Sequence, residues 1–230
     1  MEYKLTFFQE IAYVLGVIIL ALSVAIVTAS NLGLSMIVLP AYVLSQKISW
    51  LTFGQAEYVI QGILLIIFCL VMRKFKVHYL WSFITCLLYG ACLDLFRLIP
   101  IFNPNMTDFA SLPLYLRIIF FIVGTILTGF SVALLMKSYF HPQVYDLFTK
   151  YVSRKFNIKY FYFKLGFDIC FLALGIGMGY AFGLPLCGVG IGTLIATVAN
   201  SILITFFSNL LDRIFKYTPR INRLSDKFQD

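Results

Sequence analysis

Six long apolar runs limit what this chain can fold into more than any other feature of its sequence. They cover about residues 7–29, 53–72, 79–99, 114–136, 160–181 and 188–211. Each run is close to the roughly 20 residues that an α-helix needs to cross the apolar core of a bilayer. Only 12% of the residues are charged, whereas about a quarter are charged in soluble domains. The sequence therefore predicts an all-α, polytopic membrane protein with six transmembrane helices in one membrane domain, residues 1–230.

The positive residues indicate how the spans are oriented, because short cytoplasmic loops are enriched in Lys and Arg. With the N-terminus inside, fourteen of the 18 Lys and Arg residues lie on the cytoplasmic side. Three lie outside (Lys47, Arg97 and Arg117), and Lys164 lies within the fifth span. We therefore expect a protein of the cell (inner or cytoplasmic) membrane with both termini in the cytoplasm. The net charge of +8 is then explained by membrane lipid as the partner of the basic loops, and no nucleic acid partner is expected.

Two mixed segments, Leu34–Ser49 and Pro142–Asn157, lie between spans and are too short to cross a bilayer. Each follows the first span of its half of the chain. In Pro142–Asn157 the apolar residues recur at helical spacing, with basic residues largely on other faces. The sequence predicts a short amphipathic or re-entrant helix in each segment, and the second pattern is typical of an interfacial helix.

The two halves of the chain resemble each other when the sequence is compared with itself at an offset of 108 residues. Residues 16–18 and 23–25 then match residues 124–126 and 131–133, and Lys47 and Thr85 match Lys155 and Thr193. Chance similarity between apolar spans is the alternative, but the short helix in the same place favours a duplication. Because each copy has three spans, the second copy must be inverted, as in many secondary transporters. We expect repeat 1 at about residues 8–99, repeat 2 at about residues 116–211, and a basic cytoplasmic tail at residues 212–230.

Four short motifs give the chain a family resemblance. They are Asn-Leu-Gly-Leu-Ser at 31–35, Leu-Thr-Phe-Gly-Gln at 51–55, Leu-Tyr-Gly-Ala-Cys-Leu-Asp-Leu-Phe at 88–96, and Gly-Ile-Gly-Thr-Leu-Ile at 190–195. In these motifs the chain resembles the YczE/YyaS/YitT-type family of small bacterial integral membrane proteins. It departs from that family at residues 35–38, where Ser-Met-Ile-Val replaces a Gly-Pro-Trp-Asp-like turn. The resemblance implies a membrane fold and transport, with no particular substrate.

Four polar residues within the spans form the centre of the candidate substrate site: Glu57, Gln61, Lys164 and Asp168. A charge near the bilayer centre costs about 2.5–3.5 kcal/mol even on lenient scales, so such residues need a reason. Glu57 and Gln61 lie four residues apart, as do Lys164 and Asp168, so each pair shares a helix face. At an offset of 107 the pairs coincide, and we expect them to meet at the interface between the repeats. The alternative is an ion-pair network that only fixes helix register.

Helix breaks supply the rest of the candidate substrate site, because helix ends expose unpaired backbone groups. These residues are Asn31 and Tyr42 on the outer side and Gln143, Tyr145 and Asp146 on the inner side. Ordinary helix capping is the alternative explanation for them. Near the outer end of the third span, Asp94 and Arg97 are three residues apart and can pair across one turn. We expect them to reach the membrane surface as snorkelling side chains, and a functional role is the alternative.

The sequence has no recognisable set of nucleophile, base and orienting residue and no His and Cys residues at metal-ligand spacing, so we expect neither an enzyme nor a cofactor or metal. The leading hypothesis is a secondary transporter or exporter of a small organic or amphiphilic molecule, with alternating access between the two repeats. One alternative is the substrate-binding membrane subunit of an energy-coupling vitamin importer, suggested by Ala21 and Ala25. Another is a membrane accessory protein without transport activity. A homodimer or a partner subunit fits any of these hypotheses.

Overall fold

The computed structural model describes residues 5–77, 79–140 and 143–219, which form eight α-helices, one short 3-10 helix and two short strands. The long helices are α1 (Gln9–Ser30), α3 (Phe53–Met72), α4 (Tyr79–Phe96), α5 (Leu114–Met136), α7 (Tyr160–Ala181) and α8 (Ile191–Ile214). The short elements are β1 (Leu5–Phe8), α2 (Leu39–Lys47), η1 (Pro100–Phe102), α6 (Val144–Lys155) and β2 (Phe215–Thr218). The helical fold class is therefore confirmed.

The six long helices are long and apolar enough to cross a membrane, which confirms the prediction of a multi-pass membrane protein. Helices α3, α5 and α7 have the bounds expected from the apolar runs. Helix α8 begins later than expected, at Ile191, because the preceding Gly188 has a φ of 73°. That left-handed conformation is accessible to glycine and ends any helical path there.

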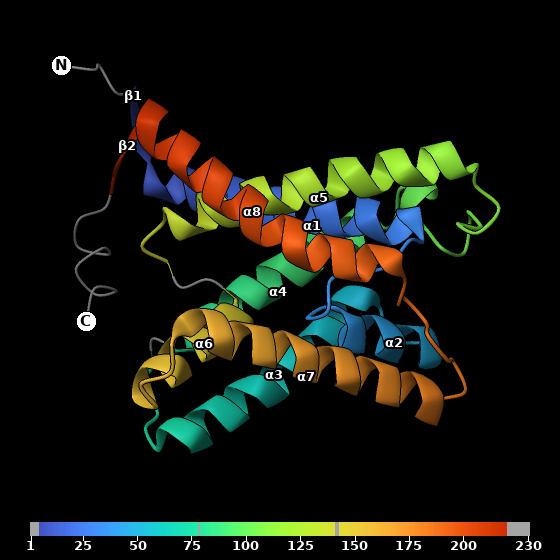
Figure 1. The fold of residues 1–230 in the computed structure, drawn as a ribbon, viewed down its shortest axis with the longest axis horizontal. Coiled ribbons are helices and arrows are strands. Elements are labelled where there is room, and N and C mark those ends of the chain that lie inside the picture. Colours follow the sequence, from blue (N-terminus) through green and yellow to red (C-terminus); the bar gives the residue numbers. More distant parts are fainter. Residues whose placement is uncertain (1–4, 78, 141–142, 220–230) are drawn as a thin grey trace.

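The helices form two groups joined by α4 (Figure 1). Helix α5 packs between α1 and α8 in one group. In the other group, α2 and α6 each pack against both α3 and α7. Helix α4 contacts α1 on one side and α3 and α6 on the other. Both short helices are therefore covered on two sides by long helices, and in α6 the apolar residues Val144, Leu147 and Val152 are buried.

Small residues allow the long helices to approach closely, as is common in membrane proteins. A Cβ atom on Gly16 of α1 would come within 2.8 Å of Leu135 of α5, and one on Gly124 of α5 would come within 2.5 Å of Val27 of α1. Between α3 and α4, a Cβ atom on Gly54 would overlap the carbonyl oxygen of Gly90. These contacts leave no room for larger side chains at either crossing.

Asp94 binds the N-terminus of α3, and no ion pair joins it to Arg97 among the described residues, although their spacing allows one. Its carboxylate accepts hydrogen bonds from the Gly54 amide at 2.8 Å and the Thr52 hydroxyl at 2.5 Å. The unpaired amides and partial positive charge of a helix N-terminus favour such a carboxylate. The Arg97 guanidinium lies over the ring of Phe53, 5.2 Å from its centroid, in a cation–π arrangement.

The two described ends of the chain lie together at one end of the molecule. Strands β1 and β2 pair in parallel, with Leu5 opposite Phe215 and Phe8 opposite Thr218. This pairing was not expected from the sequence, which assigned residues after 211 to a basic tail. It fits an even number of membrane crossings, since both ends then face the same side.

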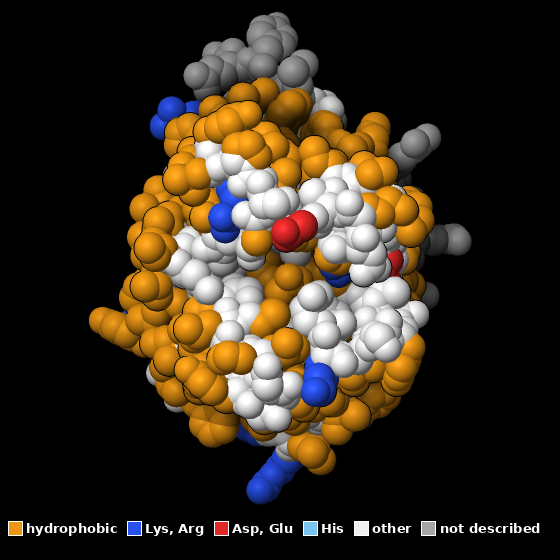
Figure 2. All heavy atoms as spheres, turned by 90° about the vertical axis from the view of Figure 1, so that its right-hand side faces the viewer, with side chains coloured by type: hydrophobic (Ala, Val, Ile, Leu, Met, Phe, Trp, Pro, Cys, Tyr) orange, Lys and Arg blue, Asp and Glu red, His pale blue; other side chains and the backbone are white. Residues whose placement is uncertain are grey.

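Hydrophobic side chains surround the end of the molecule that faces the viewer in Figure 2 and form most of its rim. Large apolar residues are exposed along the spans, for example Ile66, Leu70, Ile191 and Val198, each more than 60% exposed. In water such a surface would be strongly unfavourable, whereas lipid solvates it. Helices α7 and α8 are the most exposed of the six spans.

Candidate functional site

A fully buried polar cluster lies where α3 meets α6. Glu57 and Gln61, one turn apart on α3, have no exposed side-chain surface. The Gln61 amide Nε2 donates to Glu57 Oε2 at 2.9 Å, and the Tyr145 hydroxyl of α6 donates to the same oxygen at 3.0 Å. The Val144 backbone amide donates to Gln61 Oε1 at 3.2 Å. The start of α6 is therefore held to α3 by polar contacts inside the bundle.

The second carboxylate oxygen of Glu57, Oε1, is buried and has no hydrogen-bond partner among the described residues. Helix α4 contributes Cys86, whose thiol lies 3.8 Å from the backbone oxygen of Glu57, and the buried Tyr89. Neither α4 residue was expected at the site. The sequence does show that Ser82, Cys86 and Tyr89 share one face of α4, because they recur at helical spacing. This spacing was the signal that could have placed Cys86 and Tyr89 at the site.

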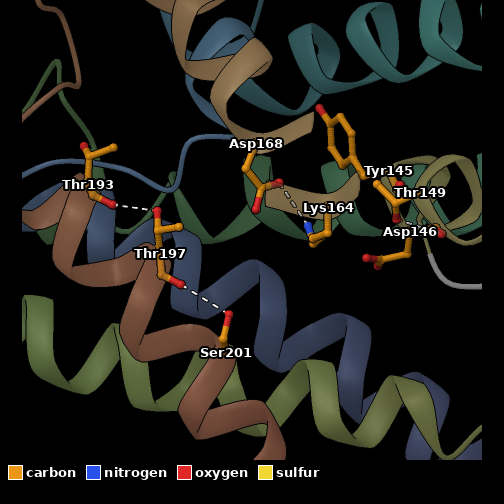
Figure 3. A network of polar contacts seen from close by, with 8 residues as sticks. All are labelled: Tyr145, Asp146, Thr149, Lys164, Asp168, Thr193, Thr197 and Ser201. Carbon is orange, nitrogen blue, oxygen red and sulfur yellow. Dashed lines mark hydrogen bonds and ion pairs between the residues drawn. The ribbon is translucent and has the colours of Figure 1, made fainter. Parts of the chain in front are cut away.

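The second predicted pair, Lys164 and Asp168, forms an ion pair on α7 (Figure 3). The Lys164 Nζ lies 3.1 Å from Asp168 Oδ1, and the two side chains are 27% and 14% exposed. Asp146 of α6 interacts electrostatically with both residues. Burial raises the pKa of the Asp146 carboxyl, and the positive charge of Lys164 opposes that shift.

The two predicted pairs do not form one cluster among the described residues. Tyr145 and Asp146 are neighbours on α6, but Tyr145 reaches Glu57 whereas Asp146 interacts with Lys164 and Asp168. Burial raises the pKa of Tyr145 well above its ordinary value, so its hydroxyl stays protonated and acts as a donor. Helix α6 therefore stands between the two pairs and contributes one residue to each.

Two of the predicted residues, Asn31 and Tyr42, lie apart from both pairs. They line a cavity of about 200 Å³ near the end of α1, together with residues 186–189 before α8. The backbone there is joined across the two halves, because the Leu34 amide donates to the Gly188 carbonyl oxygen at 2.9 Å. The end of the molecule that holds α2 and this loop is hollowed at its centre (Figure 2).

The remaining predicted residue, Gln143, is buried at the start of α6, and its Nε2 has no partner among the described residues.

A row of hydroxyl groups on α8 was not expected. Thr193, Thr197 and Ser201 follow one another at four-residue spacing, which the sequence shows. The Thr197 hydroxyl donates to the Thr193 carbonyl oxygen at 2.8 Å, and Ser201 donates to that of Thr197 at 3.4 Å. In Figure 3 this row lies on the side of α8 turned towards the ion pair of α7. No group of three or more His, Cys, Asp or Glu residues in the described ranges is placed to hold a metal ion.

Fold and polar sites together define a multi-pass helical membrane protein with buried polar groups between its helices. The chain belongs to a family of unknown function (DUF6198), which matches residues 7–209. The matched region spans all eight helices except the last turn or so of α8. No curated protein and no solved structure matches the chain. The resemblance to the YczE/YyaS/YitT-type family stays a prediction.

Proposed function

We propose that this protein is a secondary transporter or exporter of a small organic or amphiphilic molecule, and that it works by alternating access between two inverted repeats. One observation carries the proposal. Gly16 packs against Leu135, and Gly124 packs against Val27. At the 108-residue offset Gly16 corresponds to Gly124 and Val27 corresponds to Leu135, so the two contacts are equivalent. A two-fold relation between the halves requires such reciprocal contacts. Helices α1 and α5 run in opposite directions (Figure 1), which supports an axis in the membrane plane.

The packing of the other helices supports the same relation. Helix α1 contacts α4 as α5 contacts α8, and α2 contacts α7 as α6 contacts α3. Each short helix thus belongs to one half and packs on a long helix of the other. Rocking of one half against the other must break one set of these contacts at a time, which is how inverted repeats alternate access.

Two lysines close the opposite ends of this interface. Lys47, at the end of α2, donates to the Phe182 carbonyl oxygen after α7 at 3.1 Å. Lys155, at the end of α6, donates to the Val71 carbonyl oxygen near the end of α3 at 2.5 Å. The lysines are equivalent at the 108-residue offset, and a lysine at a helix C-terminus satisfies unpaired carbonyl groups. We assign Lys47 to the outer gate and Lys155 to the inner gate.

The packing of the two halves is not identical, and one of the differences supports an amphiphilic substrate. Helices α3 and α4 pack closely, but their counterparts α7 and α8 do not pack against one another among the described residues. The Lys164–Asp168 pair lies on the side of α7 that is turned towards the hydroxyl row of α8 (Figure 3), while large apolar residues are exposed on both helices. A molecule with a polar head and an apolar tail matches both surfaces.

The importer-subunit alternative is less well supported. Ala21 and Ala25, which suggested it, are fully buried in the core around α1. They are therefore not presented to an ATPase partner.

Purification in mild detergent, followed by mass spectrometry of the proteins and small molecules that co-purify, tests the proposal. We expect an organic or amphiphilic molecule, no equimolar protein partner, and protein-dependent flux of that molecule into liposomes. Flux should be lost in the double variant Lys164→Met, Asp168→Leu while the fold is retained. An equimolar ATPase would support the importer subunit. A stable double variant with full flux would exclude the α7 pair from the substrate site.

A further inference from the structure

We infer that Glu57 is a proton-binding residue, and that release of its proton frees the start of α6 from α3 and opens the inner side of the bundle. Proton binding is argued from the local geometry alone. The coupling of that proton to substrate movement rests on the proposed function.

Glu57 is a fully buried acid without a positively charged partner among the described residues. Glu57 has no exposed surface, and no ion pair joins it to a Lys or Arg of the described residues. An ionised carboxylate without such a partner is strongly unfavourable in a low-dielectric interior, so the group takes up a proton instead. In this respect Glu57 differs from Asp168, whose carboxylate has Lys164 at 3.1 Å.

The helices packed against α3 are α2, α4 and α6, and none of them brings a positive charge to Glu57. Titratable groups near it are Cys86 and Tyr89 of α4 and Tyr145 of α6, all neutral when protonated. The charged residues of these helices are engaged elsewhere, except Lys150 and Arg154 of α6, which are exposed. Lys47 and Lys155 bind carbonyl oxygens, Asp94 binds the N-terminus of α3, and Asp146 interacts with Lys164.

The two carboxylate oxygens of Glu57 differ in their hydrogen bonding. Oε2 accepts two hydrogen bonds, from Gln61 and Tyr145, whereas Oε1 accepts none. This is the pattern of a neutral acid, in which Oε2 is the carbonyl oxygen and Oε1 carries the proton. In the ionised form Oε1 would be a buried charged acceptor without a donor, which costs more than an unmatched neutral hydroxyl.

The position of α6 links this proton to access from the inner side. Tyr145 and Val144 tie the first turn of α6 to Glu57 and Gln61. When the Oε1 proton leaves to water, the carboxylate must gain solvent or a cation, and we expect the first turn of α6 to move away from α3 to admit it. Substrate or a proton that arrives from that side would restore the contact between Tyr145 and Glu57. Glu57 would therefore couple proton binding to closure of the inner gate.

Infrared difference spectroscopy of the protein in lipid bilayers tests proton binding without any transport assay. We expect a protonated-carboxyl carbonyl band at neutral pH that shifts on deuteration, disappears in Glu57→Gln and persists in Asp168→Asn. Tyr145→Phe should shift the band, because it removes one donor to the carbonyl oxygen. A neutral-pH spectrum without the band, or a band that survives Glu57→Gln in a folded protein, overturns the inference.

Cysteine labelling tests the release of α6. In a background without native cysteines, Gln143→Cys at the start of α6 should react several-fold faster with a maleimide at alkaline pH than at neutral pH. The exposed control Lys76→Cys reports the increase in labelling rate that thiol ionisation alone produces. When Glu57→Gln is added, the increase at Gln143→Cys should fall to that of the control. If the labelling rate of Gln143→Cys rises equally with and without Glu57→Gln, the coupling of Glu57 to α6 is overturned. If the band and the labelling behave as expected but no flux is found, the proton site stands and the transporter proposal fails.

Discussion

Lys47 and Lys155 make the same contact in opposite halves of the molecule. The Nζ atom of each donates to a carbonyl oxygen at the C-terminal end of a long helix from the other half, Phe182 after α7 and Val71 in α3. Helices α2 and α6 lie towards opposite ends of the bundle (Figure 1). Each end of the bundle therefore has one such lysine contact between the first and second halves of the chain.

The lysine contacts predict opposite effects of two matched substitutions. Lys155→Met should raise the labelling rate of Gln143→Cys and lower that of Asn31→Cys, whereas Lys47→Met should do the reverse. Both contacts are exposed, so each is worth at most about 1 kcal/mol and the rates should change by up to about fivefold. Maleimide labelling in liposomes measures both positions. If either substitution raises both rates, the ends open independently and alternating access is contradicted.

The orientation in the membrane gives a second prediction. Lys76 and Asn105 are both exposed, and they lie in loops at opposite ends of the spans. From the distribution of positive charge, Lys76→Cys should react with a membrane-impermeant thiol reagent only after the cells are opened. Asn105→Cys should react in intact cells. Labelling of Lys76→Cys from outside would reverse the topology, and with it the assignment of the gates.

The crossing of α3 and α4 predicts which glycine matters for stability. Gly54→Ala would place a methyl group against the Gly90 carbonyl oxygen and the Asp94 carboxylate, and overpacking of this kind costs about 1–3 kcal/mol. Gly166→Ala on α7 is the matched control, because a Cβ atom there meets nothing within 4 Å. Thermal unfolding in detergent should show a lower midpoint for Gly54→Ala and no decrease for the control. Equal midpoints would mean that the helices separate easily at this crossing.

Asp146 predicts a pH dependence of stability. Burial raises the pKa of its carboxyl above the ordinary value of 3.8, so the folded protein binds this proton more tightly than the unfolded chain. The contribution to stability is then full below the ordinary pKa and is lost as pH rises through the raised one. Relative to Asp146→Asn, the wild type should lose stability across that window. Asp108→Asn in the exposed outer loop is the control and should follow the wild type.

The sequence was informative about the spans and much less so about how they meet. Apolar length alone predicted α3, α5 and α7 to the residue, because a span must match the bilayer. Four-residue spacing predicted the Lys164–Asp168 pair and the shared face of Glu57 and Gln61, since both are local to one helix. Spacing also allowed a pair of Asp94 and Arg97, but the N-terminus of α3, distant in sequence, binds the carboxylate.

Contacts between distant segments had no local signal. Tyr145 was predicted as a site residue because it follows a helix break. Nothing in the sequence indicated that Tyr145 binds Glu57 while Asp146 interacts electrostatically with Lys164. The pairing of β1 with β2 was likewise hidden, because four-residue strands leave little pattern. The 108-residue offset is the exception. It related residues far apart, and the Gly16–Leu135 and Gly124–Val27 contacts obey it.

The last prediction concerns the ion pair on α7. Asp168→Asn leaves the Lys164 ammonium without its carboxylate partner. Such a loss costs about 3–5 kcal/mol of stability in a fully buried pair. This pair is partly exposed, so we expect a smaller cost of about 1–2 kcal/mol. The double variant Lys164→Met, Asp168→Leu removes both charges and should be more stable than Asp168→Asn. Thermal unfolding in detergent compares the two variants at equal lipid content. Should Asp168→Asn instead be as stable as the wild type, Asp146 is the carboxylate that compensates Lys164, and Asp146→Asn combined with Asp168→Asn should then show the loss.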